Sequence, residues 1–228
     1  WDQYHTYRNS AGRATRLAMP MLAHGLRSWD VTSAARVDNF AANSSHVAAR
    51  IHKYWRRDAE VVHPPVAVED FAPVARSERE DFYLWAGELA PYKRPDLAIA
   101  AFNKLEKPLV MLGGPDKTAR QLTETAGPNI KILGRVPDAQ MRELMAKCKA
   151  LIFPGEEDFG MVPVEVMASG RPVIAYGRGG AEDSVISYRT GLLFKEQTVD
   201  GLVEAVETFE REKLDQLDPN ALVSHSRR

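Results

Sequence analysis

Cysteine is almost absent from this sequence of 228 residues, which holds a single one, Cys148. One cysteine can form neither an internal disulfide nor a cysteine metal cage, so we expect a reducing, cytoplasmic setting. No apolar run approaches the ~18 residues that a membrane span needs. The opening residues, Trp1 to His5, look like neither a signal peptide nor a normal start. We therefore expect a chain that is processed or cut from a longer one.

The sequence also lacks an excess of charge of either sign. Its 30 Lys and Arg face 31 Asp and Glu, for a net charge of -1. A broad hold on nucleic acid needs a strong basic excess, so we expect no nucleic-acid partner. The six histidines show no zinc spacing, and no Asp-x-Asp triplet is present to hold Mg²⁺ or Mn²⁺. We expect neither a bound metal nor a resident cofactor.

Three common catalytic or nucleotide-binding motifs are missing as well. The sequence contains no Gly-rich loop ending in Lys-Ser or Lys-Thr, no G-x-G-x-x-G and no G-x-S-x-G. These absences remove the sequence support for a P-loop enzyme, a dinucleotide-binding enzyme and a serine hydrolase.

Short apolar runs that alternate with helical patterns dominate residues 71–228. Helices are predicted to begin at Pro95 and near Asp138, to cover 162–169, and to follow Thr198. This alternation predicts a doubly wound α/β domain, a parallel sheet covered by helices on both faces. Ligands bind such sheets at the carboxyl ends of the strands. The predicted strands are Phe82 to Gly87, Leu109 to Leu112, Ile130 to Leu133, Ala150 to Phe153 and Val173 to Tyr176.

Residues 1–70 have a different pattern and are predicted to be a separate block. We expect a strand over 39–42, a helix capped by Ser44 or Ser45, and a strand over 60–63 that ends at two prolines. Residues 67–80 are acidic with little periodicity, which is typical of a linker. The predicted domains are therefore 1–70 and 71–228.

The sharpest candidate site follows the predicted strand 150–153. Gly160 permits unusual backbone angles there, and the amides of Gly160, Met161 and Val162 would open a helix able to bind phosphate or sugar oxygens. Glu157 and Glu165 flank that helix start, and a carboxylate suits a ribose or hexose diol. The alternative is that both glutamates only complement the helix dipole.

A second candidate lies at the end of the first strand of the sheet, where Gly87 and Glu88 lead to Lys93 and Arg94. Cations at a helix N-terminus are unfavourable by ~0.3–1 kcal/mol each, unless an anion binds there. The alternative is a pair of solvated cations offset by Asp96. Further glycine turns end other strands and predict a cleft when taken together; they lie at 113–114, 134–136 and 177–180.

The run from Glu157 to Glu165, two glutamates separated by seven residues with Phe159-Gly160 between them, resembles the signature of retaining glycosyltransferases of family 4. These enzymes have the GT-B architecture of two facing Rossmann-like domains. The residues of this run look most like those of the bacterial mannosyl and rhamnosyl subset. The surrounding motifs follow in the family's order. These motifs are Tyr92-Lys93-Arg94-Pro95-Asp96-Leu97, Gly134-Arg135-Val136, 171–176 with Gly179-Gly180, and Gly191-Leu192-Leu193-Phe194.

The resemblance implies roles for individual residues. By this match Glu157 contacts the hydroxyls of the donor sugar, Glu165 holds the ribose diol and Lys93 neutralises the diphosphate. The site implied by the resemblance counts Glu157 and Lys93 as catalytic. Its other members would bind the nucleotide-sugar donor: Gly87, Glu88, Arg94, Gly113, Arg135, Val136, Phe159, Gly160, Met161, Val162 and Glu165.

Two departures from the family pattern are visible. Glu88 stands where the family commonly has an arginine, and a carboxylate beside a diphosphate is repulsive. Either Arg94 substitutes for that arginine, or Glu88 turns away, or donor binding is weakened. Most of the first, acceptor-side domain is also missing, so we expect 1–70 to be its C-terminal part.

By resemblance, the chain is expected to move a hexose, best mannose, from a nucleotide-diphosphate sugar to a glycan or lipid-linked acceptor, with retention and without metal. A lipid-linked acceptor would bring peripheral contact with the inner face of the membrane. One alternative is a donor-binding module that is inactive alone or completed by a partner chain. Another is a GT-B nucleotide-sugar epimerase.

Overall fold

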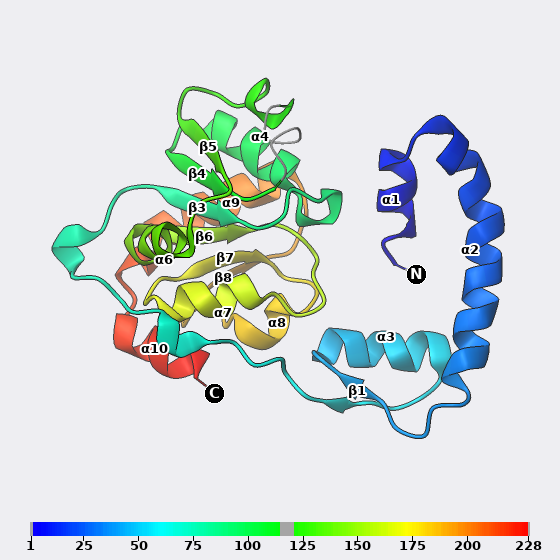
Figure 1. Ribbon diagram of the computed structural model, residues 1–228. Helices are drawn as coiled ribbons and strands as arrows, with labels where there is room; N and C mark the ends of the chain where they lie inside the picture. Colours follow the sequence, from blue (N-terminus) through cyan, green and yellow to red (C-terminus); the bar gives the residue numbers. More distant parts are fainter. Residues whose placement is uncertain (1, 115–120, 228) are drawn as a thin grey trace. The chain divides into compact units, whose positions relative to one another are not determined.

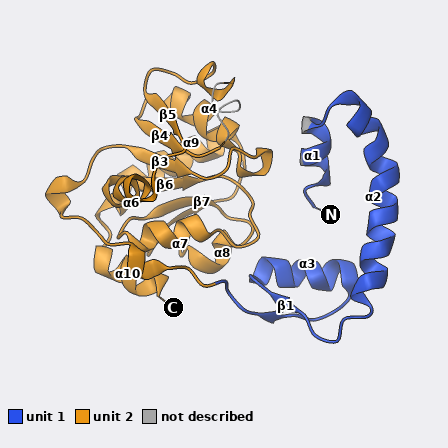
Figure 2. Cartoon of the chain, in the orientation of Figure 1, with its two compact units in different colours: residues 1–64 blue, residues 65–228 orange. Residues whose placement is uncertain are grey.

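The computed structural model describes residues 2–114 and 121–227. The chain divides into two compact units, residues 1–64 and residues 65–228, drawn in different colours in Figure 2. The boundary predicted from the sequence lies between residues 70 and 71.

Unit 1 combines helices with a small parallel βαβ motif. Its helices are α1 (Tyr4–Ser10), α2 (Arg13–Ala34) and α3 (Ser45–Trp55). Strand β1 (Ala41–Ala42) pairs in parallel with β2 (Glu60–Val61) on either side of α3. Ser44 caps α3, because its hydroxyl accepts a hydrogen bond from the Val47 amide. The expected cap and both expected strands are confirmed.

Unit 2 is built on a parallel sheet that, within the described residues, has six strands (Figure 1). The strand order is β5-β4-β3-β6-β7-β8, and every neighbouring pair is parallel. The predicted doubly wound α/β fold is thereby confirmed. The strands are β3 (Tyr83–Ala86), β4 (Leu109–Leu112), β5 (Ile130–Gly134), β6 (Ala150–Phe153), β7 (Val173–Tyr176) and β8 (Gly191–Phe194).

Helices cover both faces of this sheet, and alternate residues of each strand point to opposite faces. Along β3, Tyr83 and Trp85 pack with helices α4 (Pro95–Leu105) and α9 (Val199–Arg211). Leu84 and Ala86 pack on the other side with α6 (Asp138–Lys147), α7 (Met161–Ala168) and α10 (Pro219–Ser226). Because both of their faces are buried, the central strands β3, β4, β6 and β7 are continuous apolar runs. The edge strand β5 contains Lys131 and is partly exposed. The remaining helix is α8 (Ala181–Ser184).

Short 3-10 turns complete the fold. The segment expected to be a linker contains η1 (Val68–Asp70) and η2 (Arg76–Glu78). Val68 and Phe71 are buried in the core of unit 2, so this segment is packed against the domain rather than free of it. The remaining turns are η3 (Pro91–Lys93) and η4 (Leu214–Gln216).

Candidate functional site

The strand order creates a crevice between β3 and β6. Strands β3, β4 and β5 run outward in one direction, and β6, β7 and β8 run outward in the other. The connections leaving β3 and β6 therefore diverge at this switch point, which is where open α/β sheets bind ligands. Lys93 lies on the connection after β3, and Glu157 lies on the connection after β6.

Lys93 and Glu157 meet at this crevice. The Lys93 Nζ lies 3.0 Å from Glu157 Oε1, and the two side chains are only 14% and 16% exposed. Withdrawing two opposite charges from water is costly unless they are paired. A charged group that enters the crevice therefore finds both a cation and an anion already held in place.

Glycines let the backbone come close around this pair. Gly87 has a φ of 154°, and a Cβ there would lie 3.3 Å from Lys93 Cδ. A Cβ on Gly155 would lie 2.7 Å from the Lys93 Cα. The side chain of Lys93 therefore packs over Gly87, and its backbone packs against Gly155. Gly113, with a φ of 107°, packs directly on the Gly87 carbonyl.

The N-terminus of α7 borders the same connection. Gly160 precedes the helix with a φ of 86°, a left-handed conformation that favours glycine, and no side chain caps the helix. Met161 is exposed and Val162 is partly buried, whereas Phe159 is buried in the apolar core. The amides of the first turn can hydrogen-bond an anion, while the Phe159 ring contributes packing.

Glu165 lies in the second turn of α7 and is partly buried. Burial raises the pKa of its carboxyl above the ordinary value. Within the described part of the chain no side chain forms an ion pair with the Glu165 carboxylate. Its backbone carbonyl accepts hydrogen bonds from the amide and the hydroxyl of Ser169. Hydroxyl donors would stabilise the ionised form of this carboxylate.

The structure gives Glu88 a cationic partner. Arg135, which follows β5, donates a hydrogen bond to the Glu88 carboxylate over 3.1 Å, and both side chains are exposed. Arg94 instead donates to both oxygens of Asp96 and to Gln197. Arg135 therefore offsets the charge of Glu88, and Arg94 is held by residues other than the crevice pair.

A glycine pair after β7, one of the glycine turns that together predict a cleft, packs against the connection that follows β6. A Cβ on Gly180 would lie 2.3 Å from the Phe159 Cα, and the Gly180 amide donates to the Glu157 carbonyl over 2.8 Å. Gly179 approaches the same carbonyl. The adjacent pair of glycines was the available signal in the sequence. The contact itself could not be predicted from local patterns, because 20 residues lie between Phe159 and Gly180. Val136 packs at the edge of the core.

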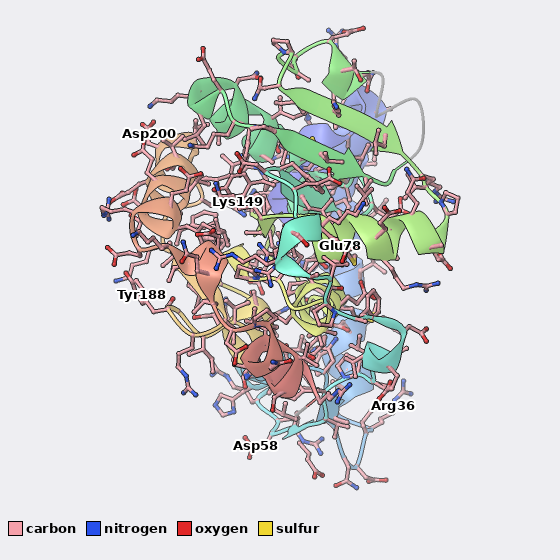
Figure 3. The ribbon with its side chains drawn as sticks, turned by 90° about the vertical axis from the view of Figure 1, so that its left-hand side faces the viewer. Arg36, Asp58, Glu78, Lys149, Tyr188 and Asp200 are labelled. Atoms are coloured by element: carbon pink, nitrogen blue, oxygen red, sulfur yellow. The ribbon has the colours of Figure 1, made fainter. Side chains whose placement is uncertain are left out.

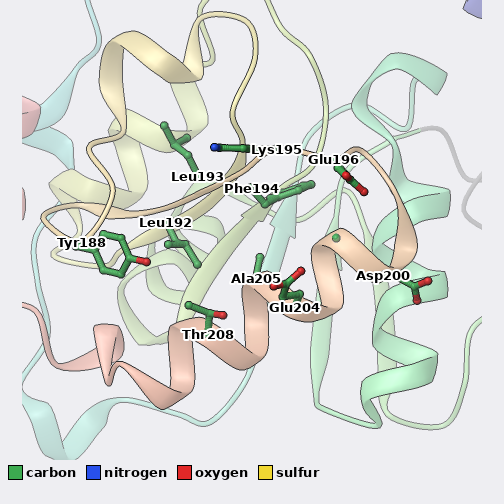
Figure 4. Close-up of a pocket in the computed structure, with 11 residues that line it drawn as sticks. Tyr188, Leu192, Leu193, Phe194, Lys195, Glu196, Asp200, Glu204, Ala205 and Thr208 are labelled. Atoms are coloured by element: carbon green, nitrogen blue, oxygen red, sulfur yellow. The ribbon is translucent and has the colours of Figure 1, made fainter.

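A separate hollow of about 400 Å³ lies between β8 and α9 (Figure 4). Tyr188, Leu192 and Thr208 line it together with several acidic side chains. None of the predicted site residues lines this hollow, so it is distinct from the crevice.

Two kinds of feature are absent from the described residues. Over residues 2–114 and 121–227, no helix is both long and apolar enough to cross a membrane. In the same ranges no three His, Cys, Asp or Glu side chains gather in a group that could hold a metal ion.

A parallel doubly wound sheet with a paired lysine and glutamate at its switch point defines a Rossmann-like ligand-binding domain. Comparison of sequences identifies the family: residues 68–222 match the model of glycosyl transferases group 1, and the chain belongs to this family.

Individual relatives agree with this assignment. The chain is 30% identical to the GDP-mannose-dependent alpha-mannosyltransferase of Mycolicibacterium smegmatis, over 80% of this chain and 48% of that protein. It is 29% identical to the D-inositol 3-phosphate glycosyltransferase of Mycobacteroides abscessus, over 68% of this chain and 40% of that protein. The chain thus spans about half or less of the length of these relatives.

Solved structures show the same fold. HepE of Anabaena, in complex with UDP and glucose, matches with a TM-score of 0.73 and 21% identity, over 89% of this chain and 62% of that one. Sucrose-phosphate synthase of Thermosynechococcus elongatus matches with a TM-score of 0.78 and 19% identity, over 97% of this chain and 60% of that one.

Proposed function

We propose that this chain provides the donor-binding half of a retaining glycosyltransferase of family 4. The proposed reaction transfers a hexose, with mannose from GDP-mannose as the first choice, to a glycan or lipid-linked acceptor. The observation that carries the proposal is the largely buried pair of Lys93 and Glu157 at the switch point of the sheet. The choice of donor is supported by the mannosyltransferase relative, which is 30% identical to this chain over the aligned residues.

The proposed reaction breaks the bond between the anomeric carbon of the sugar and a phosphate oxygen, and forms a bond from that carbon to the oxygen of an acceptor hydroxyl, whose proton passes to the leaving diphosphate. Negative charge then grows on the leaving diphosphate, and donors aimed at that charge lower the barrier. Lys93 and the first amides of α7 are the groups proposed to supply this stabilisation. Glu157 is proposed to bind the sugar hydroxyls and Glu165 the ribose diol, which orients the donor.

Four further parts of the site have supporting roles in this proposal. Gly87 and Gly113 leave room for the lysine and its ligand. The Arg135–Glu88 pair and Val136 are proposed to border the base, while Arg94 positions its loop through Asp96. We propose that no metal takes part, and that the membrane contact, if the acceptor is a lipid, is peripheral.

Calorimetric titration of the chain with GDP, UDP, GDP-mannose and UDP-glucose, with and without EDTA, tests this proposal. The expected result is binding to guanine nucleotides that EDTA does not weaken and that is tighter for the sugar conjugate. Binding only to uridine nucleotides would change the proposed donor to a UDP-sugar and leave the proposed enzyme class unchanged. Absence of binding by the folded chain would refute the donor-site assignment, and interconversion of a UDP-sugar without acceptor would indicate an epimerase.

A further inference from the structure

A second group of charged side chains lies at the opposite edge of the sheet from Lys93 and Glu157. It lines a pocket of about 230 Å³ at the amino ends of the strands, just before β3, β6 and β7. Figure 3 turns this edge toward the viewer and labels Lys149 there. The proposed function does not use this pocket. Its cationic members are Arg76, Arg79, Lys149 and Arg171.

Most of the carboxylates at this edge already have cationic partners. Lys149 Nζ lies 3.0 Å from both Asp81 and Glu210. Lys147 lies 3.4 Å from Glu80. Asp81 and Glu210 neutralise the charge of Lys149, so this lysine does not attract an anion by itself.

The charges that line the pocket do not balance. Its four cationic side chains face the three carboxylates of Glu80, Asp81 and Asp215, which leaves an excess of one positive charge. Among the described residues, none of the pocket's three arginines forms an ion pair within 4.0 Å. A compact anion is therefore the ligand that this charge distribution favours.

Two guanidinium nitrogens in the pocket have no acceptor. Arg171 is only 3% exposed, and its Nε and Nη2 donate to the backbone carbonyls of Cys148 and Lys149. Over the described ranges, the buried Nη1 of Arg171 and the buried Nε of Arg79 have no hydrogen-bond partner. A buried donor without an acceptor is destabilising, and here two such donors belong to like-charged side chains.

The guanidinium groups of Arg79 and Arg171 repel each other. Burial lowers the pKa of the Arg171 guanidinium, and the positive charge of Arg79 lowers it further. An anion bound at the two guanidinium groups would offset this repulsion and supply acceptors for their N–H donors.

We propose that this pocket binds a phosphate group through Arg79 and Arg171. Guanidinium groups present paired N–H donors that match the oxygens of a tetrahedral oxyanion. The group can arrive as inorganic phosphate or as the end of a small phosphomonoester, and its chemistry is the same in both cases.

Nuclear magnetic resonance of the ¹⁵N-labelled chain tests the proposal with two probes, sodium phosphate and glycerol phosphate, at constant ionic strength. The expected result is a saturable shift of the amides next to Arg79, Lys149 and Arg171 with at least one probe. Tighter binding of one probe would distinguish the free ion from the ester. No saturable shift at these amides with either probe, or shifts that chloride reproduces at equal ionic strength, would overturn the proposal.

Three variants assign the binding to this pocket. Arg79→Met should weaken phosphate binding at least tenfold, while Arg189→Met, which removes an exposed arginine before β8, should leave it unchanged. Lys93→Met separates the pocket from the crevice, since phosphate binding here should survive it. Unchanged affinity in Arg79→Met, or loss of the shifts in Lys93→Met, would refute the assignment, and the shifts in the unaltered chain stand even if a variant fails to fold.

Discussion

Glu157, which follows β6, forms an ion pair with Lys93, which follows β3, at the crevice. The Lys93–Glu157 distance of 3.0 Å and the low exposure of both side chains fix this geometry before any ligand binds. Preorganised charges of this kind need little rearrangement during binding. Variants of the site can therefore separate recognition of the sugar from recognition of the nucleotide.

Replacing Glu157 should affect the sugar part of the donor alone. We expect Glu157→Ala to keep the affinity for a free nucleotide but to weaken binding of the nucleotide-sugar by about 1–3 kcal/mol, since a charged acceptor is lost. Calorimetry with both ligands measures the difference. Glu207→Ala, on the exposed side of α9, is the matched control. Equal losses for the two ligands would contradict the proposed division of roles.

Replacing Glu165 should weaken every nucleotide that carries a ribose. We expect Glu165→Ala to cost about 1–3 kcal/mol of binding free energy for the free nucleotide and for its sugar conjugate alike. Burial raises the pKa of Glu165, so affinity should begin to fall at a higher pH than for an exposed glutamate. Full affinity in a folded Glu165→Ala protein would refute the ribose role.

The residues of the crevice were largely visible in the sequence, but their partners were not. Lys93 and Glu157 stood out because each follows a strand in a parallel pattern, and such strand ends share one edge. The pairing of Arg135 with Glu88 joins residues 47 positions apart. A link of that length depends on the sheet register, which local patterns do not encode.

At the scale of whole elements, α9 is tied to the sheet by Glu210. Its carboxylate accepts hydrogen bonds from Tyr83 of β3 over 2.8 Å, from Lys107 over 2.7 Å and from Lys149 over 3.0 Å. Burial alone would raise the pKa of Glu210, but these hydrogen bonds lower it to about 2. The folded carboxyl therefore binds a proton less readily than an unfolded one, whose ordinary pKa is 4.5.

This difference predicts how stability depends on pH. A lowered pKa contributes stability that is present above pH 4.5 and is lost as the pH falls toward 2. We expect Glu210→Gln to reduce the free energy of unfolding by about 1–3 kcal/mol at neutral pH. The gap from the unaltered chain should shrink in acid.

Urea unfolding followed by circular dichroism at several pH values measures both effects. Glu204→Gln, which changes an exposed residue of the same helix, is the control. A gap that stays constant between pH 7 and pH 2 would show that the stabilisation does not depend on the charge of Glu210.

The elements that the sequence did not predict have identifiable reasons. Helix α2 contains Pro20, and a proline inside a helical pattern argues against a continuous helix. Strand β8 has four residues and was quoted only as a family motif. Helix α10 did carry a usable signal, since Asp218 caps it and Pro219 opens it. The central strands β3, β4, β6 and β7 were predicted because burial on both faces leaves an unbroken apolar run.

The two units of the molecule differ in how much apolar surface they bury. Both large apolar clusters consist only of residues from unit 2, between Val68 and Leu222. In unit 1 the described buried apolar residues are Ala34, Ala42 and Ile51. Leu17 and Met21 of α2 are more than 80% exposed. Because burial of apolar surface supplies most of the folding free energy, unit 2 has the means to fold by itself.

Separate expression of residues 65–228 tests this expectation together with the position of the site. We expect the fragment to unfold in one cooperative transition, because its core is complete. Its nucleotide affinity should lie within about twofold of the full chain, since Lys93, Glu157 and Glu165 all belong to unit 2. Residues 1–64, expressed alone as the control, should show no cooperative transition. A folded fragment that loses nucleotide binding would mean that unit 1 supplies part of the donor site, and the crevice between β3 and β6 would then be incomplete without it.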